Sequence, residues 1–92
     1  MTSNLQTPWQ ISDQAIANAV GDEMVVLHLA NGTYFGLDPV GAILWDTLSA
    51  GHRPAAALER ILANFDVTRE VAEQDLDRFL GELEQGDLIA RA

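Results

Sequence analysis

The sequence contains no cysteine, and this absence excludes several kinds of site. A disulfide framework, a thiol nucleophile and a cysteine-based metal site all need that residue. The two histidines have no clear partners: His28 lies inside a predicted strand, as a core or interface residue would, and His52 lies in a polar loop. The carboxylates lack the matched pair and pocket that general acid–base catalysis requires. We therefore predict a protein that is not an enzyme and holds no cofactor or metal.

Basic residues are also scarce, because five lysines and arginines face 14 acidic residues and give a formal charge of −9. Such a charge repels nucleic acid phosphates and favours basic or neutral partners, and it also keeps a small domain in solution. From Glu70 to Asp87 the chain carries seven acidic residues and one basic residue, Arg78. A DNA-recognition helix needs basic or amide side chains, so we predict no nucleic acid binding.

Long apolar runs are absent too. No run approaches the ~20 residues that a membrane span needs, and the N-terminus lacks the basic start and apolar centre of a secretory signal. We therefore predict a cytoplasmic protein without a membrane partner. The 92 residues fit one domain, and we divide them into an N-terminal tail at 1–14 and a folded domain at 15–92.

The stretch from Met24 to Leu48 organises the chain. Asn31-Gly32 lies between two apolar runs and is typical of a two-residue type I′ hairpin turn. That turn predicts four cross-strand pairs: Ala30 with Thr33, Leu29 with Tyr34, His28 with Phe35 and Val26 with Leu37. The second strand then ends at Asp38-Pro39, where aspartate suits a helix N-cap and proline suits the first helical position.

Hydrophobic periodicity predicts the remaining elements. We expect an α+β fold in which a three-stranded antiparallel sheet is followed by three helices, an arrangement similar to a winged helix-turn-helix. The strands are predicted at 15–20, 23–30 and 33–37, and the helices at 39–50, 54–65 and 69–85. Thr68 is the predicted N-cap of the third helix and Gly51 the residue that follows the first. The predicted core consists of Phe35, Leu37, Ile43, Leu44, Leu48, Leu58, Ile61, Leu62 and Leu80.

Both faces of the predicted sheet are substantially apolar. In the first two strands, Ile16 is expected to face Leu27, and Ala17 to face Val26. The helices cover the face that holds Val26, Phe35 and Leu37. The other face, with Ile16, Leu27 and Tyr34, needs a different cover, which could be the Trp9 region, a second subunit or a ligand.

The third strand has a neighbour on one side only, so its other edge is expected to be open. The third helix carries the apolar stripe Leu76, Phe79 and Leu83 flanked by charged residues. One interpretation is that the whole stripe packs in the core. The other is that part of it lines a groove beside the open strand, which would suit binding of an extended peptide as an additional strand.

Two motifs in sequence resemble the PqqD family, the peptide-recognition domains of pathways that modify ribosomally made peptides. They are Gly32-x-Tyr34-Phe35-x-Leu37-Asp38 and Gly41-x-Ile43-x-Trp45-x-x-Leu48. The resemblance covers about residues 15–90. Many family members have asparagine where this chain has Asp38, and either residue can cap a helix.

The resemblance implies that the leader segment of a precursor peptide binds as an extra strand beside the third strand and against the third helix. Carried over residue by residue, it gives a peptide-binding site made of Thr33, Tyr34, Phe35, Gly36, Leu37, Asp75, Leu76, Arg78, Phe79, Glu82 and Leu83.

The small free-standing chain looks most like the leader-binding protein of lasso-peptide clusters. That resemblance implies a non-catalytic adaptor whose partners are the precursor peptide and a leader protease, a cyclase or another modifying enzyme. We expect a monomer or a weak homodimer. The alternatives are a chaperone of the pyrroloquinoline quinone precursor and a winged-helix regulatory module.

Overall fold

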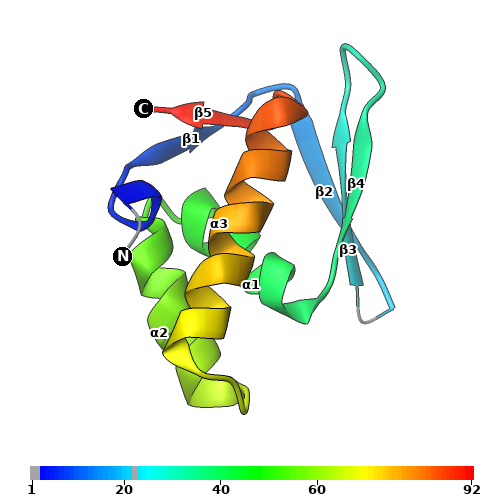
Figure 1. Cartoon of the computed structure of the whole chain (residues 1–92). Coiled ribbons are helices and arrows are strands. Elements are labelled where there is room, and N and C mark those ends of the chain that lie inside the picture. Colours follow the sequence, from blue (N-terminus) through cyan, green and yellow to red (C-terminus); the bar gives the residue numbers. More distant parts are fainter. Residues whose placement is uncertain (1–2, 22) are drawn as a thin grey trace.

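The computed structural model describes residues 3–21 and 23–92. In these ranges a short 3-10 helix, η1, and a strand, β1, precede three further strands, three α-helices and a final strand, β5 (Figure 1). The bounds are η1 Ser3–Leu5, β1 Trp9–Ile11, β2 Ala15–Val20, β3 Glu23–His28, β4 Tyr34–Leu37, α1 Pro39–Ser49, α2 Pro54–Asn64, α3 Arg69–Gln85 and β5 Ile89–Arg91.

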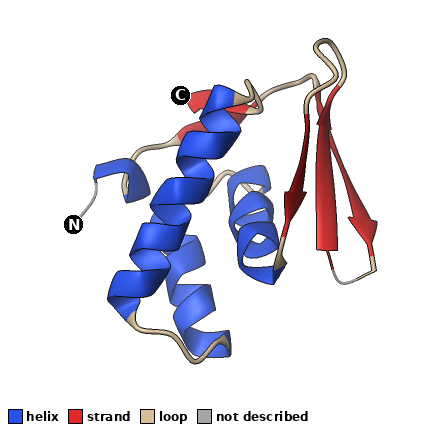
Figure 2. Ribbon diagram, turned by 45° about the vertical axis from the view of Figure 1, so that its right-hand side comes forward, coloured by secondary structure: helices blue, strands red, loops and turns tan. Residues whose placement is uncertain are grey.

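The larger sheet is antiparallel with the order β2-β3-β4. Figure 2 shows this sheet on one side of the molecule and the helices on the other, with no ribbon beyond the sheet. The predicted α+β fold and its strand-then-helix order are therefore confirmed, with helix ends within one residue of their expected positions. The pairing of β2 with β3 also follows the prediction, since Ile16 faces Leu27 and Ala17 faces Val26.

The hairpin between β3 and β4 differs from the prediction. Its pairs are Met24–Leu37, Val25–Gly36, Val26–Phe35 and Leu27–Tyr34, so all four predicted pairs were wrong by two residues. The turn is not of type I′, because Gly32 has a positive φ of 76° whereas Asn31 is not among the described residues with positive φ. A shift by two residues keeps every side chain on its predicted face.

Side-chain hydrogen bonds explain the longer loop. The Asn31 side-chain oxygen accepts from the amide of Thr33 at 2.8 Å, and the Nδ1 atom of His28 accepts from the amides of Ala30 and Asn31 at 3.2 and 3.3 Å. The asparagine thus bonds the backbone two residues ahead rather than adopting a left-handed conformation. His28 is buried, as expected of a core histidine, and it organises the turn.

Side-chain caps define the helix starts. The Asp38 carboxylate accepts from the Gly41 amide at 2.9 Å, and the Thr68 hydroxyl accepts from the Val71 amide at 3.2 Å. Gly51 follows α1 with a φ of 85°, which is the expected C′ glycine. These three predictions are confirmed, and they fix where the helices begin and end relative to β4.

The core forms between the inner face of the sheet and the helices. Six of the nine predicted core residues are buried: Leu37, Leu44, Leu48, Leu58, Ile61 and Leu80. The other three, Phe35, Ile43 and Leu62, are only half-buried and pack against the core. Trp45, which follows Leu44 on α1, is buried, so the buried face of this helix includes Trp45 rather than Ile43.

The N-terminal segment adds a small sheet that periodicity did not predict. β1 pairs with β5 in antiparallel register, with Trp9 opposite Arg91. Trp9 is buried and its Nε1 donates to the Asn4 carbonyl at 3.1 Å, while the Arg91 guanidinium lies 5.2 Å from its ring centroid. Leu5 and Trp9 belong to the core and Ile11 packs against it, so this segment is held on the folded domain.

The outer face of the larger sheet is uncovered within the described part of the chain. Ile16, Leu27 and Tyr34 are 43%, 38% and 72% exposed. The idea that the Trp9 region covers this face was wrong, because Trp9 is buried in the core on the opposite side of the sheet. A second subunit or a ligand thus stays as the possible cover.

Candidate functional site

A groove of about 370 Å³ lies between β4 and α3. Its lining residues come from β3, β4, the Asp38 cap and α3: Glu23, Phe35, Gly36, Leu37, Asp38, Arg78, Phe79 and Glu82.

The edge of β4 that faces away from β3 has no strand partner among the described residues. The His28 amide donates to the Thr33 carbonyl at 2.8 Å, which makes this a hydrogen-bonded pair. Because hydrogen-bonded pairs alternate along an antiparallel ladder, Phe35 and Leu37 also bond to β3. The backbone N–H and C=O groups of Tyr34 and Gly36 therefore point toward the open edge.

The floor of the groove is apolar. Leu37 and Phe79 are buried, and Phe35 is half-buried. A β-carbon on Gly41 would lie 3.0 Å from a Leu37 side-chain atom and 3.2 Å from the Phe79 ring. Glycine therefore lets α1 approach the Leu37 side chain and the Phe79 ring at the base of the groove, where a larger residue would press on both.

The rim of the groove is charged. The Arg78 guanidinium lies 3.6 Å from the Asp75 carboxylate, 3.9 Å from that of Glu82 and 4.7 Å from the centroid of the Phe79 ring. Arg78 is half-exposed, so its two ion pairs contribute little to stability. They hold the guanidinium over the phenyl ring, where it covers one side of the apolar floor.

Six of the eleven predicted site residues line this groove, namely Phe35, Gly36, Leu37, Arg78, Phe79 and Glu82. Thr33 and Tyr34 are exposed, the former at the end of the hairpin loop and the latter on β4. Asp75 is not a lining residue, but its carboxylate forms an ion pair with Arg78, which is. Leu76 and Leu83 are fully buried in the core and do not line the groove.

Two lining residues, Glu23 and Asp38, were missing from the predicted site. Asp38 was considered only as a helix cap, which it is. Glu23 begins β3 next to the Met24–Leu37 pair, so the observed register places it beside the end of β4. The predicted register placed Leu37 opposite Val26 and left Glu23 remote from the groove. Had the length of the loop between β3 and β4 been predicted correctly, the register would have placed Glu23 beside the end of β4.

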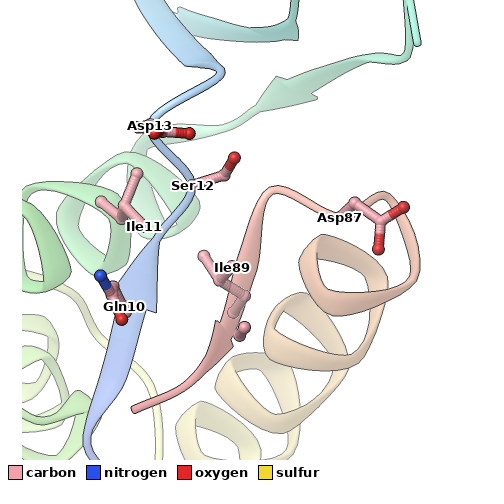
Figure 3. A pocket seen from close by; sticks show the side chains of 7 residues that line it. Gln10, Ile11, Ser12, Asp13, Asp87 and Ile89 are labelled. Carbon is pink, nitrogen blue, oxygen red and sulfur yellow. The ribbon is translucent and has the colours of Figure 1, made fainter. Parts of the chain in front are cut away.

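A second cavity, of about 360 Å³, lies between β1, the segment after it and the turn that joins α3 to β5. Figure 3 shows Gln10 and Ile11 on β1, Ile89 on β5 and Asp87 on the turn. It shares no lining residue with the groove. Within residues 3–21 and 23–92, no group of three or more histidine, aspartate or glutamate side chains could hold a metal ion. No helix in these ranges is long and apolar enough to cross a membrane.

Comparison with solved structures gives two close matches. The structure of TbiB1 in complex with the TbiA(beta) leader peptide is 42% identical, with a TM-score of 0.79 over 87% of this chain and 93% of that one. The structure of lasso peptide synthetase B1 complexed with the leader peptide is 22% identical, with a TM-score of 0.80 over 90% of this chain and 98% of that one. The second match supports the fold alone.

A search among curated proteins found no match. The family model of coenzyme PQQ synthesis protein D matches residues 23–89, which is well over half of the chain and includes the whole groove. With a 42% identical relative of the same fold, this match shows that the chain belongs to the PqqD family.

Proposed function

We propose that this protein binds the leader segment of a ribosomally made precursor peptide as an additional strand beside β4. The observation that carries the proposal is a strand edge with no partner strand among the described residues, lying along an apolar groove, with the backbone groups of Tyr34 and Gly36 directed outward. The complex of the 42% identical TbiB1 with a leader peptide supports it.

Backbone hydrogen bonds from β4 supply affinity that does not depend on the peptide sequence. Alternate side chains of an added strand point to opposite faces of the sheet. Those on the helix side enter the groove and contact Phe35, Leu37 and Phe79, which gives a preference for apolar residues at every second position. Arg78 and Glu82 at the rim influence register and charge preference.

The protein acts without chemistry of its own. It holds the precursor near partner enzymes and so raises the effective concentration of the substrate there. We assign those partners to lasso-peptide biosynthesis, as a leader protease and a cyclase or another modifying enzyme, and we place the process in the cytoplasm. A chaperone of the pyrroloquinoline quinone precursor is the alternative, supported by the family model, whereas the lasso assignment has the 42% identical relative.

An amide NMR titration tests the proposal. The labelled protein is titrated with a synthetic peptide that spans the leader of the precursor encoded in the same gene cluster. We expect the largest shifts at residues 34–37 and 75–82, because these border the groove. Tight binding that leaves the amides of Tyr34 and Gly36 unchanged would reject strand addition.

Replacing Arg78 with glutamate is expected to weaken leader binding about threefold to tenfold. Glutamate cannot lie over the Phe79 ring as the guanidinium does, and it adds a like charge between Asp75 and Glu82. Because Arg78 is half-exposed, we expect the free energy of unfolding to fall by less than about 1 kcal/mol.

Arg69→Glu is the matched control for this variant. Arg69 lies on the same helix with the same side-chain exposure of 56%, but it pairs with Glu59 and does not line the groove. Fluorescence anisotropy with a labelled leader peptide measures both variants. Equal losses in the two variants would mean that net charge, rather than the groove, accounts for the effect.

We expect no binding to duplex DNA at physiological salt. Between Glu70 and Asp87, on α3 and the turn after it, the chain carries seven acidic residues and one arginine, Arg78, which is paired with Asp75 and Glu82. The other arginine of α3, Arg69 at its first position, is paired with Glu59. Phosphate contacts would need unpaired basic side chains along this helix. A salt-dependent gel shift at micromolar protein would contradict the adaptor function and favour a winged-helix regulator.

A further inference from the structure

The outer face of the sheet is arranged in rows that run across the strands to the open edge. One row contains Ile16, Leu27 and Tyr34, which are paired from β2 through β3 to β4. All three are exposed, and Tyr34, next to the open edge, is exposed at 72%. The apolar row therefore ends where an added strand would begin.

The next row contains Asn18, Val25 and Gly36. Gly36 leaves a gap at the end of this row, because an added β-carbon would meet nothing within 4 Å. The backbone does not require glycine there, since Gly36 is not among the described glycines with positive φ. Nor does a close neighbour require it, in contrast to Gly41. The free protein thus gives no reason for the missing side chain.

An added strand gives a reason. Residues directly opposite each other in a sheet direct their side chains to the same face. The peptide residue opposite Gly36 therefore directs its side chain onto the outer face, above the gap and beside Tyr34. This holds for either direction of the peptide strand, because the alternation of faces does not depend on direction.

We infer that the bound leader carries a large apolar side chain opposite Gly36, seated over the glycine and against the ring of Tyr34. This inference rests on the proposed function and adds a second point of recognition to it, on the face opposite the groove. The six residues of the two rows are uncharged, which favours an apolar side chain over a charged one at this position. Charged residues of the leader would then be recognised by Arg78 and Glu82 at the rim of the groove.

Gly36→Val tests the inference. Valine keeps the outward amide, meets nothing within 4 Å at its β-carbon and suits a strand better than glycine does, so the free domain should remain folded. We nevertheless expect leader affinity to fall about tenfold, because the valine side chain occupies the space of the peptide side chain. Affinity is measured by anisotropy with the labelled leader of the same gene cluster, and folding by thermal melting.

A double-mutant cycle gives a second readout. NMR contacts to Gly36 identify the peptide residue opposite it, and that residue is replaced by alanine. We expect Tyr34→Ala and the peptide substitution each to weaken binding about threefold to fivefold, with a combined effect smaller than the product. Additive effects, or a small or charged peptide residue opposite Gly36, would overturn the inference.

The experiments separate this inference from the function on which it rests. If the unaltered protein fails to bind the leader, the proposed function fails. If it binds, and Gly36→Val binds equally well, only the outer-face contact fails. If Tyr34→Ala leaves leader affinity unchanged but slows processing by the partner protease, or abolishes a dimer seen by sedimentation, the face binds an enzyme or a second copy instead.

Discussion

Replacing Leu44 with alanine is expected to lower the free energy of unfolding by about 2–5 kcal/mol. Leu44 is fully buried on the inner face of α1, between the sheet and the other helices. Its removal leaves a cavity that the surrounding side chains cannot fill without moving the helix. For a domain of 92 residues this is a large share of the total stability. Urea unfolding followed by circular dichroism measures the loss.

Ile43→Ala is the control for this variant. Ile43 neighbours Leu44 on the same helix but is half-buried, so we expect a smaller loss. Both substitutions introduce alanine into a helix, and propensity therefore contributes about equally to each. A loss below about 1 kcal/mol for Leu44→Ala would mean that α1 does not hold its inner face against the core.

Gly36→Pro is expected to weaken leader binding by about tenfold or more. Proline removes the N–H group that we place at the open edge of β4, and its ring occupies space where the peptide backbone would approach. The domain itself should remain folded, because this amide is not needed by the β3–β4 ladder and proline is tolerated on edge strands.

Gly36→Ala separates the two effects of the proline substitution. Alanine keeps the amide, and its β-carbon would meet nothing within 4 Å, so we expect leader affinity within about threefold of the unaltered protein. Isothermal titration calorimetry measures both variants, and their melting temperatures report on folding. Unchanged affinity in a folded Gly36→Pro variant would exclude backbone pairing at this residue.

Much of the fold follows from local signals that act independently of the rest of the chain. The Asp38 and Thr68 caps and the glycine after α1 lie where their side-chain chemistry requires. Alternation placed the correct residues on each face of the sheet even though the register was wrong. An error of two residues leaves the faces unchanged, whereas an error of one would have exchanged them.

The remaining differences depend on tertiary contacts. Asn31-Gly32 favours a two-residue turn, but His28 is buried nearby and its Nδ1 accepts two loop amides, which stabilises a longer loop. β1 and β5 have three residues each, too few to show a period. They form because Trp9 and Ile89 bury against the same core.

The part of the candidate site that lies on β4 and α3 was predictable from the sequence. A helical stripe identifies which residues share a face, but it does not tell which of them reach the groove. Leu76 and Leu83 are fully buried in the core, whereas Phe79 on the same stripe lines the groove. Glu23 could not be assigned to the site without the observed register.

The open edge of β4 also links the abundance of the protein to that of its ligand. An unpaired strand edge is a site where chains associate nonspecifically, and β4 carries the exposed Tyr34 there. A peptide that adds to this edge requires the folded strand, so it stabilises the folded state by mass action, by about 2.7 kcal/mol when present at 100 times its dissociation constant. Co-expression with the precursor should therefore raise the melting temperature, the protease resistance and the soluble yield of the protein.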